Sequence, residues 1–130
     1  MDRKNLVGAS EVSTILGMNP FSTPLQLFSL KKGLIPDTEE NEYMEWGNRL
    51  EKVVSEKFAD KHGVKLIAYK KRFVHPTMPF FSCELDNIIV GTDEIVEIKT
   101  VSAYSLHKWA EPDEIPEYVI IQVMAQMGLS

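Results

Sequence analysis

Two carboxylates and a lysine lie close together in a part of the sequence that otherwise predicts β-strands. Asp86 lies in an apolar run that continues to Val90, and Glu97 and Lys99 alternate with apolar residues in the next run. This alternation places Glu97 and Lys99 on one face of their strand. The turn residues 91–93 between the two runs predict a hairpin, so Asp86 and Glu97 are expected at the same end of the sheet.

A shared divalent cation is the chemistry that such a pair of carboxylates indicates. Two close carboxylates repel each other, which raises a pKa unless a cation lies between them. Hard oxygen ligands with no His or Cys nearby favour Mg²⁺, or Mn²⁺, over Zn²⁺. Glu51, on the apolar side of a predicted helix, is the natural third ligand. For Glu97 and Lys99 taken alone, a structural ion pair is the alternative.

The elements that must position these side chains are predicted from periodicity and from helix caps. Expected helices span 10–17, 23–33, 43–62, 102–110 and 117 to the end, and expected strands span 64–75, 80–90 and 94–100. Ser10 is the expected N-cap of the first helix, and Ser22 or Thr23 that of the second. Gly63 is expected to end the long third helix.

The long helix carries two adjacent lines of residues that indicate its buried side. They are Trp46, Leu50, Val53 and Lys57 on one line, and Gly47, Glu51, Val54 and Phe58 on the other. Trp46 is therefore expected in the core. Glu51 is expected on or beside the buried stripe, where a carboxylate needs a partner.

Composition limits the class of protein. A chain of 130 residues with 44% hydrophobic and 25% charged residues has the size and composition of one globular domain. The sequence shows neither a signal peptide nor an apolar run long enough to span a membrane. Cys83, the single cysteine, excludes an internal disulfide, fits a reducing cytoplasm and is expected to be a small strand residue. The three scattered histidines are expected to be structural or exposed.

The net charge of −5 argues mildly against DNA as a partner, because phosphate binding depends on Lys and Arg. Carboxylates that hold a metal ion no longer repel phosphate, because the bound cation reverses their local electrostatic effect. The distribution of charge therefore matters more than the net charge. Basic residues cluster at 31–32 and at 70–72. Either cluster is more readily explained as solvated surface, so charge alone does not decide whether the protein binds DNA.

With this constellation the sequence resembles the PD-(D/E)XK nuclease superfamily and, within it, the YqaJ-type viral recombinase family, which includes phage lambda exonuclease. The resemblance covers nearly the whole chain. It is carried by Arg3, 8–12, 15–17, 24–28, 32–33, 47–51, 75–76, Leu85, Asp86, 97–99, Trp109, 115–118, Gln122 and Gln126. It implies an α/β (α+β) fold with a restriction-endonuclease-like core, in which helices flank a central mixed sheet.

The resemblance also implies roles for the residues of the predicted metal site. Asp86 and Glu97 would bind the metal ions, with the carbonyl group of Ile98 as a further ligand. Lys99 would orient the attacking water or stabilise charge on the scissile phosphate. Glu51 would contribute to a second metal ion or hold its water.

Three further residues match functional positions of the family. Gln122, on the last helix, would complete the pocket near the nucleophile. Arg3 and Ser10 match positions that bind the terminal 5′-phosphate in the exonuclease branch. Arginine makes bidentate phosphate contacts, and a helix N-terminus attracts anions. Ser10 acting only as an N-cap, and Arg3 as a loose N-terminal residue, remain the alternatives.

The function implied is Mg²⁺-dependent hydrolysis of duplex DNA from a 5′ end, leaving a 3′ tail for a single-strand annealing protein in phage recombination. A ring-shaped homo-oligomer and a cytoplasmic location, in a bacterial host and encoded by a phage or prophage, follow from the same resemblance. The alternatives are an endonuclease or repair nuclease of the same fold, and a non-catalytic DNA-binding or assembly module.

Two departures from the family pattern qualify these expectations. Leu85 precedes Asp86 where the superfamily motif has proline, a change that removes no ligand. The family core also adds a strand after the last helix, and that strand is not found before Ser130. The 130 residues are therefore expected to be the N-terminal and central part of a single nuclease domain, with an unpaired sheet edge. A minimal or decayed version of the fold is the alternative.

Overall fold

The two strand runs predicted at 64–75 and 80–90 each form two short strands. In the computed structural model, β2 (Leu66–Ala68) pairs antiparallel with β5 (Asn87–Ile89), and β3 (Phe73–Val74) pairs antiparallel with β4 (Phe81–Cys83). Each run is broken by charged residues, at Arg72 and its neighbours in one and at Glu84 in the other, which do not continue the apolar alternation.

The chain divides into two units at these breaks. The structure describes residues 3–109 and 114–130. The first unit contains residues from 1–38, 72–84 and 111–130, and the second contains 39–71 and 85–110. Where the sequence predicts one central sheet, the hydrogen-bonded strands form two three-stranded sheets, one in each unit. The α/β class, with helices and strands in both units, is as predicted.

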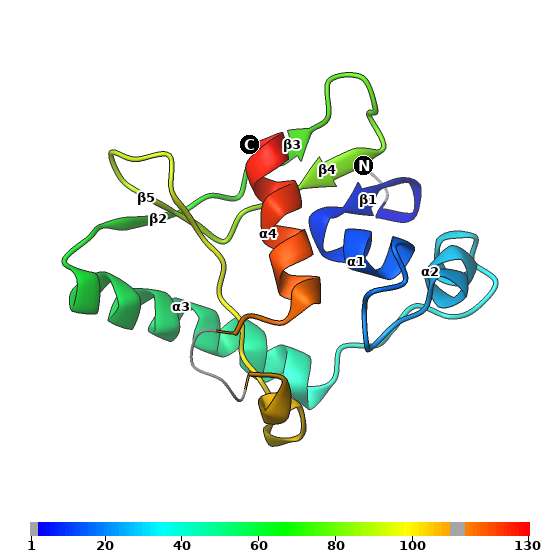
Figure 1. Cartoon of the computed structure of the whole chain (residues 1–130), viewed down its shortest axis with the longest axis horizontal. Helices are drawn as coiled ribbons and strands as arrows, with labels where there is room; N and C mark the ends of the chain where they lie inside the picture. The colour runs from blue at the N-terminus through cyan, green and yellow to red at the C-terminus, as the bar shows by residue number, and fades with distance from the viewer. Residues whose placement is uncertain (1–2, 110–113) are drawn as a thin grey trace. The chain divides into compact units, whose positions relative to one another are not determined.

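The first unit combines a small mixed sheet with short helices (Figure 1). In its sheet β4 lies between β1 (Val7–Gly8), with which it is parallel, and β3, with which it is antiparallel. Its other elements are η1 (Arg3–Asn5), η2 (Ala9–Glu11), α1 (Val12–Ile15), α2 (Pro24–Lys31) and α4 (Glu117–Leu129). Helix α4 packs against η2, α1 and β4 and so forms the centre of the unit.

Helix caps in this unit follow the sequence in one case and depart from it in another. The Thr23 side chain accepts a hydrogen bond from the Gln26 backbone, and the Gln26 side chain accepts one from Thr23, which confirms the predicted start of α2. Ser10 is not an N-cap, because it lies inside η2. The carboxylate of Glu11 instead accepts a hydrogen bond from the Gly8 backbone N–H at 3.0 Å.

The buried face of α1 is made of small hydroxyl residues rather than large apolar ones. Ser13 is 1% exposed and Thr14 is 4% exposed, whereas Ile15 and Leu16 are exposed. The Ser13 hydroxyl accepts a hydrogen bond from the Asn19 side chain, so its polar atom is satisfied. Small side chains at this position let the backbone of α1 approach α4 closely.

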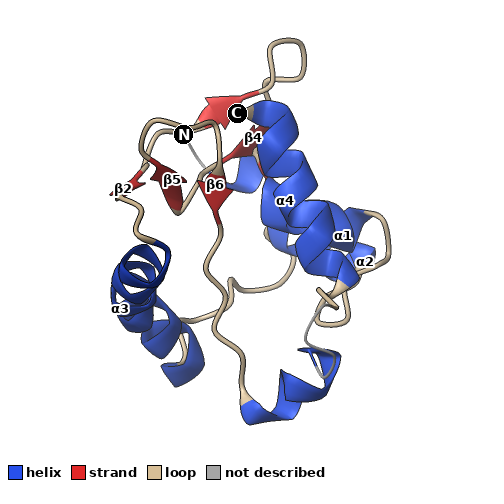
Figure 2. Ribbon diagram, turned by 60° about the vertical axis from the view of Figure 1, so that its left-hand side comes forward, coloured by secondary structure: helices blue, strands red, loops and turns tan. Residues whose placement is uncertain are grey.

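The second unit consists of the long helix α3 (Glu42–His62), the antiparallel sheet β2-β5-β6, and the 3₁₀ segment η3 (Ala103–Trp109). Asn41 caps the start of α3 by accepting from the Met44 backbone, and Gly63, with φ of +62°, ends it as predicted. The predicted hairpin is confirmed: β5 pairs antiparallel with β6 (Ile95–Val96) (Figure 2).

The packing of α3 differs from the prediction. None of its residues is buried, and its half-buried side runs through Gly47, Glu51 and Phe58. Trp46 is 55% exposed, so the expectation that it lies in the core was wrong. The helix comes close to the segment after β6 at Gly47, where an added Cβ atom would lie 3.1 Å from Thr100 Oγ1. The contact uses the side of the helix that carries Gly47, and the side that carries Trp46 is exposed.

No helix in the described part of the chain is both long enough and apolar enough to cross a bilayer.

Candidate active site

The β5–β6 hairpin places Asp86 opposite Glu97. Its register pairs Asn87 with Val96. Asp86 and Glu97 are the next residues on the two arms of the hairpin, one position farther from the turn. The Asp86 carboxylate accepts a hydrogen bond from the Ile98 backbone N–H at 3.0 Å, which holds the two chain segments together beyond the last paired residues. The convergence of Asp86 and Glu97 predicted from the turn is therefore present in the second unit.

The electrostatics of Asp86 show that its neighbours are acidic. The pKa of Asp86 is raised from 3.8 to about 6, chiefly by burial and against the lowering effect of the Ile98 N–H. The negative charges of Glu97 and Glu51 and a side-chain hydrogen bond between Asp86 and Glu97 contribute to this rise. Three carboxylates therefore act on one another here, and at neutral pH they form a site of excess negative charge.

Lys99 accompanies the carboxylates on the same face, as the alternation predicts. Its Nζ lies 3.1 Å from Glu97 Oε1, and the two side chains are 31% and 11% exposed. The intervening residue, Ile98, directs its N–H to Asp86. This geometry serves a structural ion pair and a catalytic lysine equally, so the role of Lys99 and that of the Ile98 carbonyl group remain predictions.

Glu51 reaches this site from helix α3. It is half-buried, one turn after Gly47, the residue at which the helix comes closest to Thr100. Because residues four apart lie on one face of a helix, the Gly47 contact directs Glu51 toward the chain that carries Glu97 and Lys99. The effect of Glu51 on the pKa of Asp86 is the electrostatic consequence.

The donor set is suited to a divalent cation by its chemistry. Asp86, Glu97 and Glu51 supply hard carboxylate oxygens, and a bound cation would offset both the burial of Asp86 and the neighbouring negative charges, which together raise its pKa. Within residues 3–109 and 114–130, no three His, Cys, Asp or Glu side chains are already gathered closely enough to hold a metal ion. The structure therefore supports the pair Asp86 and Glu97 most directly, and Glu51 through its charge.

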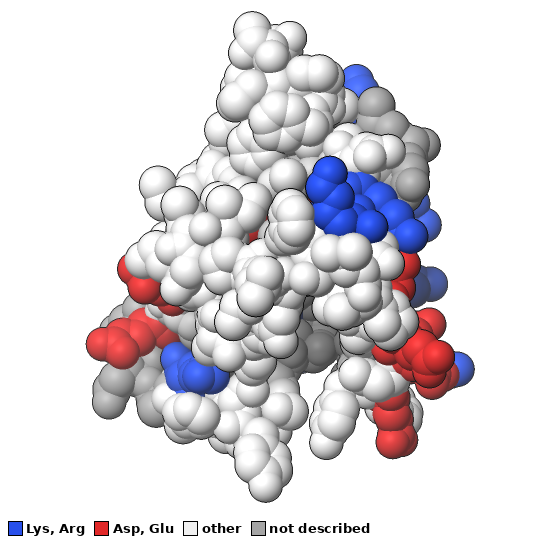
Figure 3. Space-filling view, turned by 90° about the vertical axis from the view of Figure 1, so that its right-hand side faces the viewer, with Lys and Arg blue, Asp and Glu red and all other residues white. Residues whose placement is uncertain are grey.

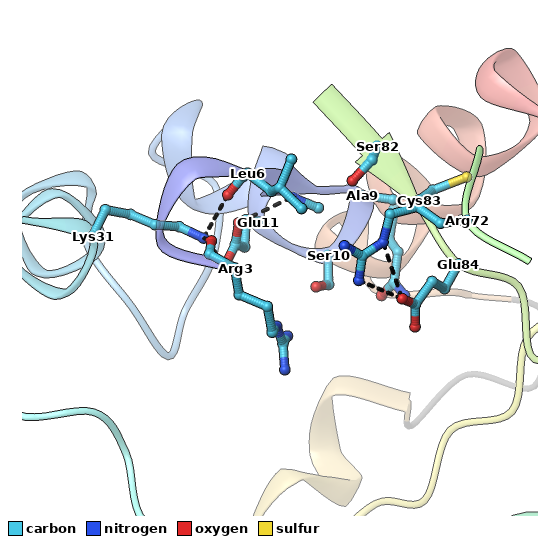
Figure 4. A pocket seen from close by; sticks show the side chains of 12 residues that line it. Arg3, Leu6, Ala9, Ser10, Glu11, Lys31, Arg72, Ser82, Cys83 and Glu84 are labelled. Atoms are coloured by element: carbon cyan, nitrogen blue, oxygen red, sulfur yellow. Dashed lines mark hydrogen bonds and ion pairs between the residues drawn. The ribbon is translucent and has the colours of Figure 1, made fainter. Parts of the chain in front are cut away.

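A second feature, in the first unit, is a polar pocket of about 250 Å³ (Figure 4). Basic and acidic side chains both line it. The residues that matter for its chemistry are Arg3, Ser10, Glu11, Lys31, Arg72, Glu84 and Gln122. The pocket thus contains both residues predicted to bind a terminal phosphate. It also contains Gln122, which is 8% exposed and belongs to a different unit from Asp86, so its predicted catalytic role remains untested.

Lys31 is fully engaged within the pocket wall. Its Nζ lies 2.9 Å from Glu11 Oε1 and donates to the carbonyl oxygens of Arg3 and Leu6 at 2.8 and 2.6 Å. An ammonium group has three donors, and these contacts use all of them. Lys31 therefore connects α2 with the turn at 3–6 through hydrogen bonds, and its donors are not available to a ligand.

Arg72 and Glu84 are the residues of the pocket that the sequence did not single out. The Nε and Nη2 atoms of Arg72 both donate to Glu84 Oε1. Arg72 belongs to the basic cluster at 70–72, for which solvated surface is the favoured explanation. It directly precedes β3, whose partner strand β4 is followed directly by Glu84, and this juxtaposition follows from the strand pairing.

Charged side chains also lie on the face drawn in Figure 3. Basic atoms form a cluster in its upper right part, acidic atoms lie mainly at the lower right and the left, and most of the remaining surface is uncharged. His75 accepts backbone hydrogen bonds from Thr77 and Met78, and His62 packs against Phe58, so both are structural as predicted.

Comparisons with known proteins agree with one another. The family model of the YqaJ-like viral recombinase domain matches residues 1–130. The uncharacterized protein YqaJ of Bacillus subtilis (strain 168) is 38% identical over 130 residues, which cover 99% of this chain and 40% of that protein. The chain thus spans less than half of this curated relative.

Two crystal structures of LHK-Exo share the fold. One is described as an alkaline exonuclease from Laribacter hongkongensis (TM-score 0.77, 21% identity), and the other is its complex with dAMP (TM-score 0.76, 19% identity). In both cases the match covers 98% of this chain and 65% of the solved chain. The likeness confirms the predicted restriction-endonuclease-like α/β fold.

Proposed function

The chain belongs to the YqaJ-like viral recombinase family, and from this premise we propose that it forms part of a metal-dependent nuclease that hydrolyses phosphodiester bonds in DNA. The observation that carries the proposal is the placement of Asp86 opposite Glu97, with Lys99 3.1 Å from Glu97. Two carboxylates and one lysine on a hairpin are the groups that a metal-assisted phosphodiesterase needs.

In this proposal Asp86, Glu97 and Glu51, with the carbonyl group of Ile98, hold Mg²⁺, and Mn²⁺ is the alternative ion. The bound cation supplies an activated water and neutralises charge on the phosphate. The N–H of Ile98 holds the Asp86 carboxylate in place. Lys99 adds a positive charge where negative charge develops on the scissile phosphate.

The preferred substrate in this proposal is a duplex end that carries a 5′-phosphate. Arg3 and Ser10 line the pocket of the first unit, and among the described residues neither side chain makes a hydrogen bond that would occupy it. Both can therefore donate to a phosphate. Gln122 lines the same pocket and, by the family resemblance, completes the surroundings of the nucleophile. The description of LHK-Exo as an exonuclease, with a structure containing dAMP, favours an end-directed reaction.

Digestion from the 5′ end leaves a 3′-ended single strand. We propose that a single-strand annealing protein uses this strand in phage-type recombination, in the bacterial cytoplasm. A ring-shaped homo-oligomer would hold the enzyme on the duplex, and sedimentation of the protein with and without DNA tests this assembly.

The decisive experiment measures nucleotide release from three duplexes in Mg²⁺ and in EDTA. The substrates are a linear duplex with 5′-phosphates, the same duplex with 5′-hydroxyls, and a covalently closed circle. Mg²⁺-dependent release from the phosphorylated linear duplex, faster than from the hydroxyl form, supports the proposal. Cleavage of the closed circle identifies an endonuclease. Binding of all three without cleavage identifies a non-catalytic DNA-binding module.

A further inference from the structure

We propose that Arg72 is a terminal-phosphate contact in the pocket of the first unit, and that Glu84 is its internal counter-ion and sets the selectivity of the pocket for a 5′-phosphomonoester. The inference rests on the proposed function, since it concerns how a DNA end is recognised. It adds two residues that neither the motif positions nor the family resemblance assigned.

The geometry of the pair places a guanidinium group at the pocket wall and a carboxylate toward solvent. Arg72 directs Nε and Nη2 to the same oxygen of Glu84, and its other donors make no hydrogen bond to the described residues. The Arg72 side chain is 30% exposed and that of Glu84 is 58% exposed. An exposed carboxylate held through one oxygen gains little from its ion pair, so a ligand can replace it.

The backbone of Glu84 is anchored although its side chain is not. The Gln126 side chain donates to the Glu84 carbonyl oxygen at 3.3 Å, and Gln126 itself is 2% exposed on α4. The main chain therefore stays in place when the carboxylate rotates away. Figure 4 shows Arg72, Ser10 and Arg3 directed toward the same open space, with Glu84 at its edge.

The remaining charges of the pocket are already assigned to internal contacts. Lys31 pairs with Glu11 and donates to two backbone carbonyl groups. Glu11 pairs with Lys31 and accepts from the N–H of Gly8. The cations left for a ligand are Arg3 and Arg72. Two guanidinium groups and the Ser10 hydroxyl match the donors that bind a phosphate group in a bidentate manner.

Glu84 makes the pocket selective by charge. A phosphomonoester carries roughly 1.5–2 negative charges at pH 7, whereas an internal phosphodiester carries one. Only the ligand with the higher charge competes well against the carboxylate for Arg72. An internal phosphodiester carries too little charge to displace Glu84, and a 5′-hydroxyl end presents no charge to Arg72, so neither replaces the carboxylate. The pair therefore favours a phosphorylated terminus over the rest of the duplex.

The test is equilibrium binding in EDTA, at constant salt and pH 8, of short duplexes that carry either a 5′-phosphate or a 5′-hydroxyl. We expect Arg72→Gln to weaken binding of the phosphorylated duplex about tenfold or more, because it removes hydrogen bonds to a charged group. Arg72→Lys should restore only part of this affinity, because it keeps the charge but loses the fork. Glu84→Gln should strengthen binding of the hydroxyl duplex and so reduce the preference for the phosphate.

A matched control changes an ion pair outside the pocket. Lys52 and Glu56 form an exposed pair on α3, so Lys52→Gln and Glu56→Gln alter the same charges without altering the preference. Thermal unfolding of each variant shows whether the fold is intact, and Glu84→Gln keeps the test informative if Arg72→Gln unfolds. Inorganic phosphate as competitor should displace the phosphorylated duplex from the wild type and less from Arg72→Gln.

Two outcomes overturn the inference in different ways. If the wild type prefers the 5′-phosphate and both Arg72→Gln and Glu84→Gln retain that preference, Arg72 and Glu84 are structural and the inference is wrong. If the wild type itself shows no preference, the proposed end recognition fails together with the inference. Nucleotide release in Mg²⁺ tests the nuclease proposal independently of both.

Discussion

The carboxylate site of the second unit and the polar pocket of the first are opposite in charge but alike in construction. At the carboxylate site, Asp86 and Glu97 dominate, and Lys99 is paired with Glu97. In the pocket, the cations dominate, and both acidic residues, Glu11 and Glu84, are paired with them. Each site thus holds a partly compensated excess of one charge.

The difference indicates what each site must take from solution. An excess of carboxylates is relieved by a cation, and an excess of guanidinium groups by an anion. Internal counter-ions keep both sites folded when no ligand is bound. A nuclease that acts on phosphorylated ends needs one site of each kind. The predictions below test whether each internal contact serves structure or ligand binding.

The largest expected effect is on cleavage. Lys99→Ala should reduce the rate of nucleotide release by roughly 10²–10³-fold, because it removes a positive charge that acts on the transition state. Duplex binding in EDTA should be unchanged within about twofold, since other residues hold the substrate. Single-turnover cleavage of a 5′-phosphorylated duplex in Mg²⁺ measures the first quantity, and fluorescence anisotropy measures the second.

Lys99→Arg separates a structural ion pair from a catalytic lysine. An arginine keeps the charge and the pairing with Glu97 but changes the position of the donors. A catalytic lysine predicts that Lys99→Arg cleaves slowly and unfolds at the wild-type temperature. Cleavage at a rate close to wild type in Lys99→Ala would show that the ion pair is only structural and that the site assignment is wrong.

The next effect concerns stability without metal. The pKa of Asp86 is raised from 3.8 to about 6, so between these values the folded state binds more protons than the unfolded state. The contribution of Asp86 to the free energy of unfolding therefore falls as pH rises from about 4 to above 6. Asp86→Asn has no carboxylate at this position and so avoids this loss of stability. In EDTA at pH 8 the variant should unfold at a higher denaturant concentration than the wild type, with a free energy of unfolding about 2 kcal/mol larger. At pH 4 the two proteins should differ little.

Mg²⁺ should reverse the order. The cation stabilises a protein in proportion to its binding, and Asp86→Asn loses a ligand, so the wild type gains stability in Mg²⁺ and the variant gains less. Chemical denaturation at pH 8 with and without Mg²⁺ gives the four values required. Equal gains in both proteins would exclude Asp86 as a ligand.

Residues with a local conformational requirement are the part of the fold that the sequence predicts well. Gly63 and Gly91, both with positive φ, end α3 and turn the β5–β6 hairpin, and Thr23 caps α2 through its neighbour Gln26. These contacts join residues close in sequence, so their physics is contained in a short segment. The convergence of Asp86 and Glu97 follows from one such hairpin, which is why it could be predicted.

Contacts between distant segments account for what could not be predicted. Ser13 is buried because α1 packs on α4, and Trp46 is exposed because α3 uses its Gly47 side. The Arg72–Glu84 pair depends on two strand runs breaking at matching positions. Periodicity identifies apolar faces but does not say which partner covers them. Ser10 appeared to be an N-cap for the same reason, since the turn is in fact closed by Glu11 and Gly8.

The smallest expected effect separates a structural cation of the pocket from a binding one. Lys31→Met keeps most of the side-chain length but removes the pairing with Glu11 and both carbonyl contacts, so urea denaturation should show a loss of about 1–2 kcal/mol. Lys32→Met is the matched control, because Lys32 is exposed and its side chain makes no hydrogen bond or ion pair with the described residues. At temperatures where Lys31→Met is folded, its preference for a 5′-phosphate should equal that of the wild type. If Lys31→Met has normal stability but loses the preference for a 5′-phosphate, Lys31 binds the phosphate. Lys31 would then be a phosphate-binding residue like Arg72 and not a structural one.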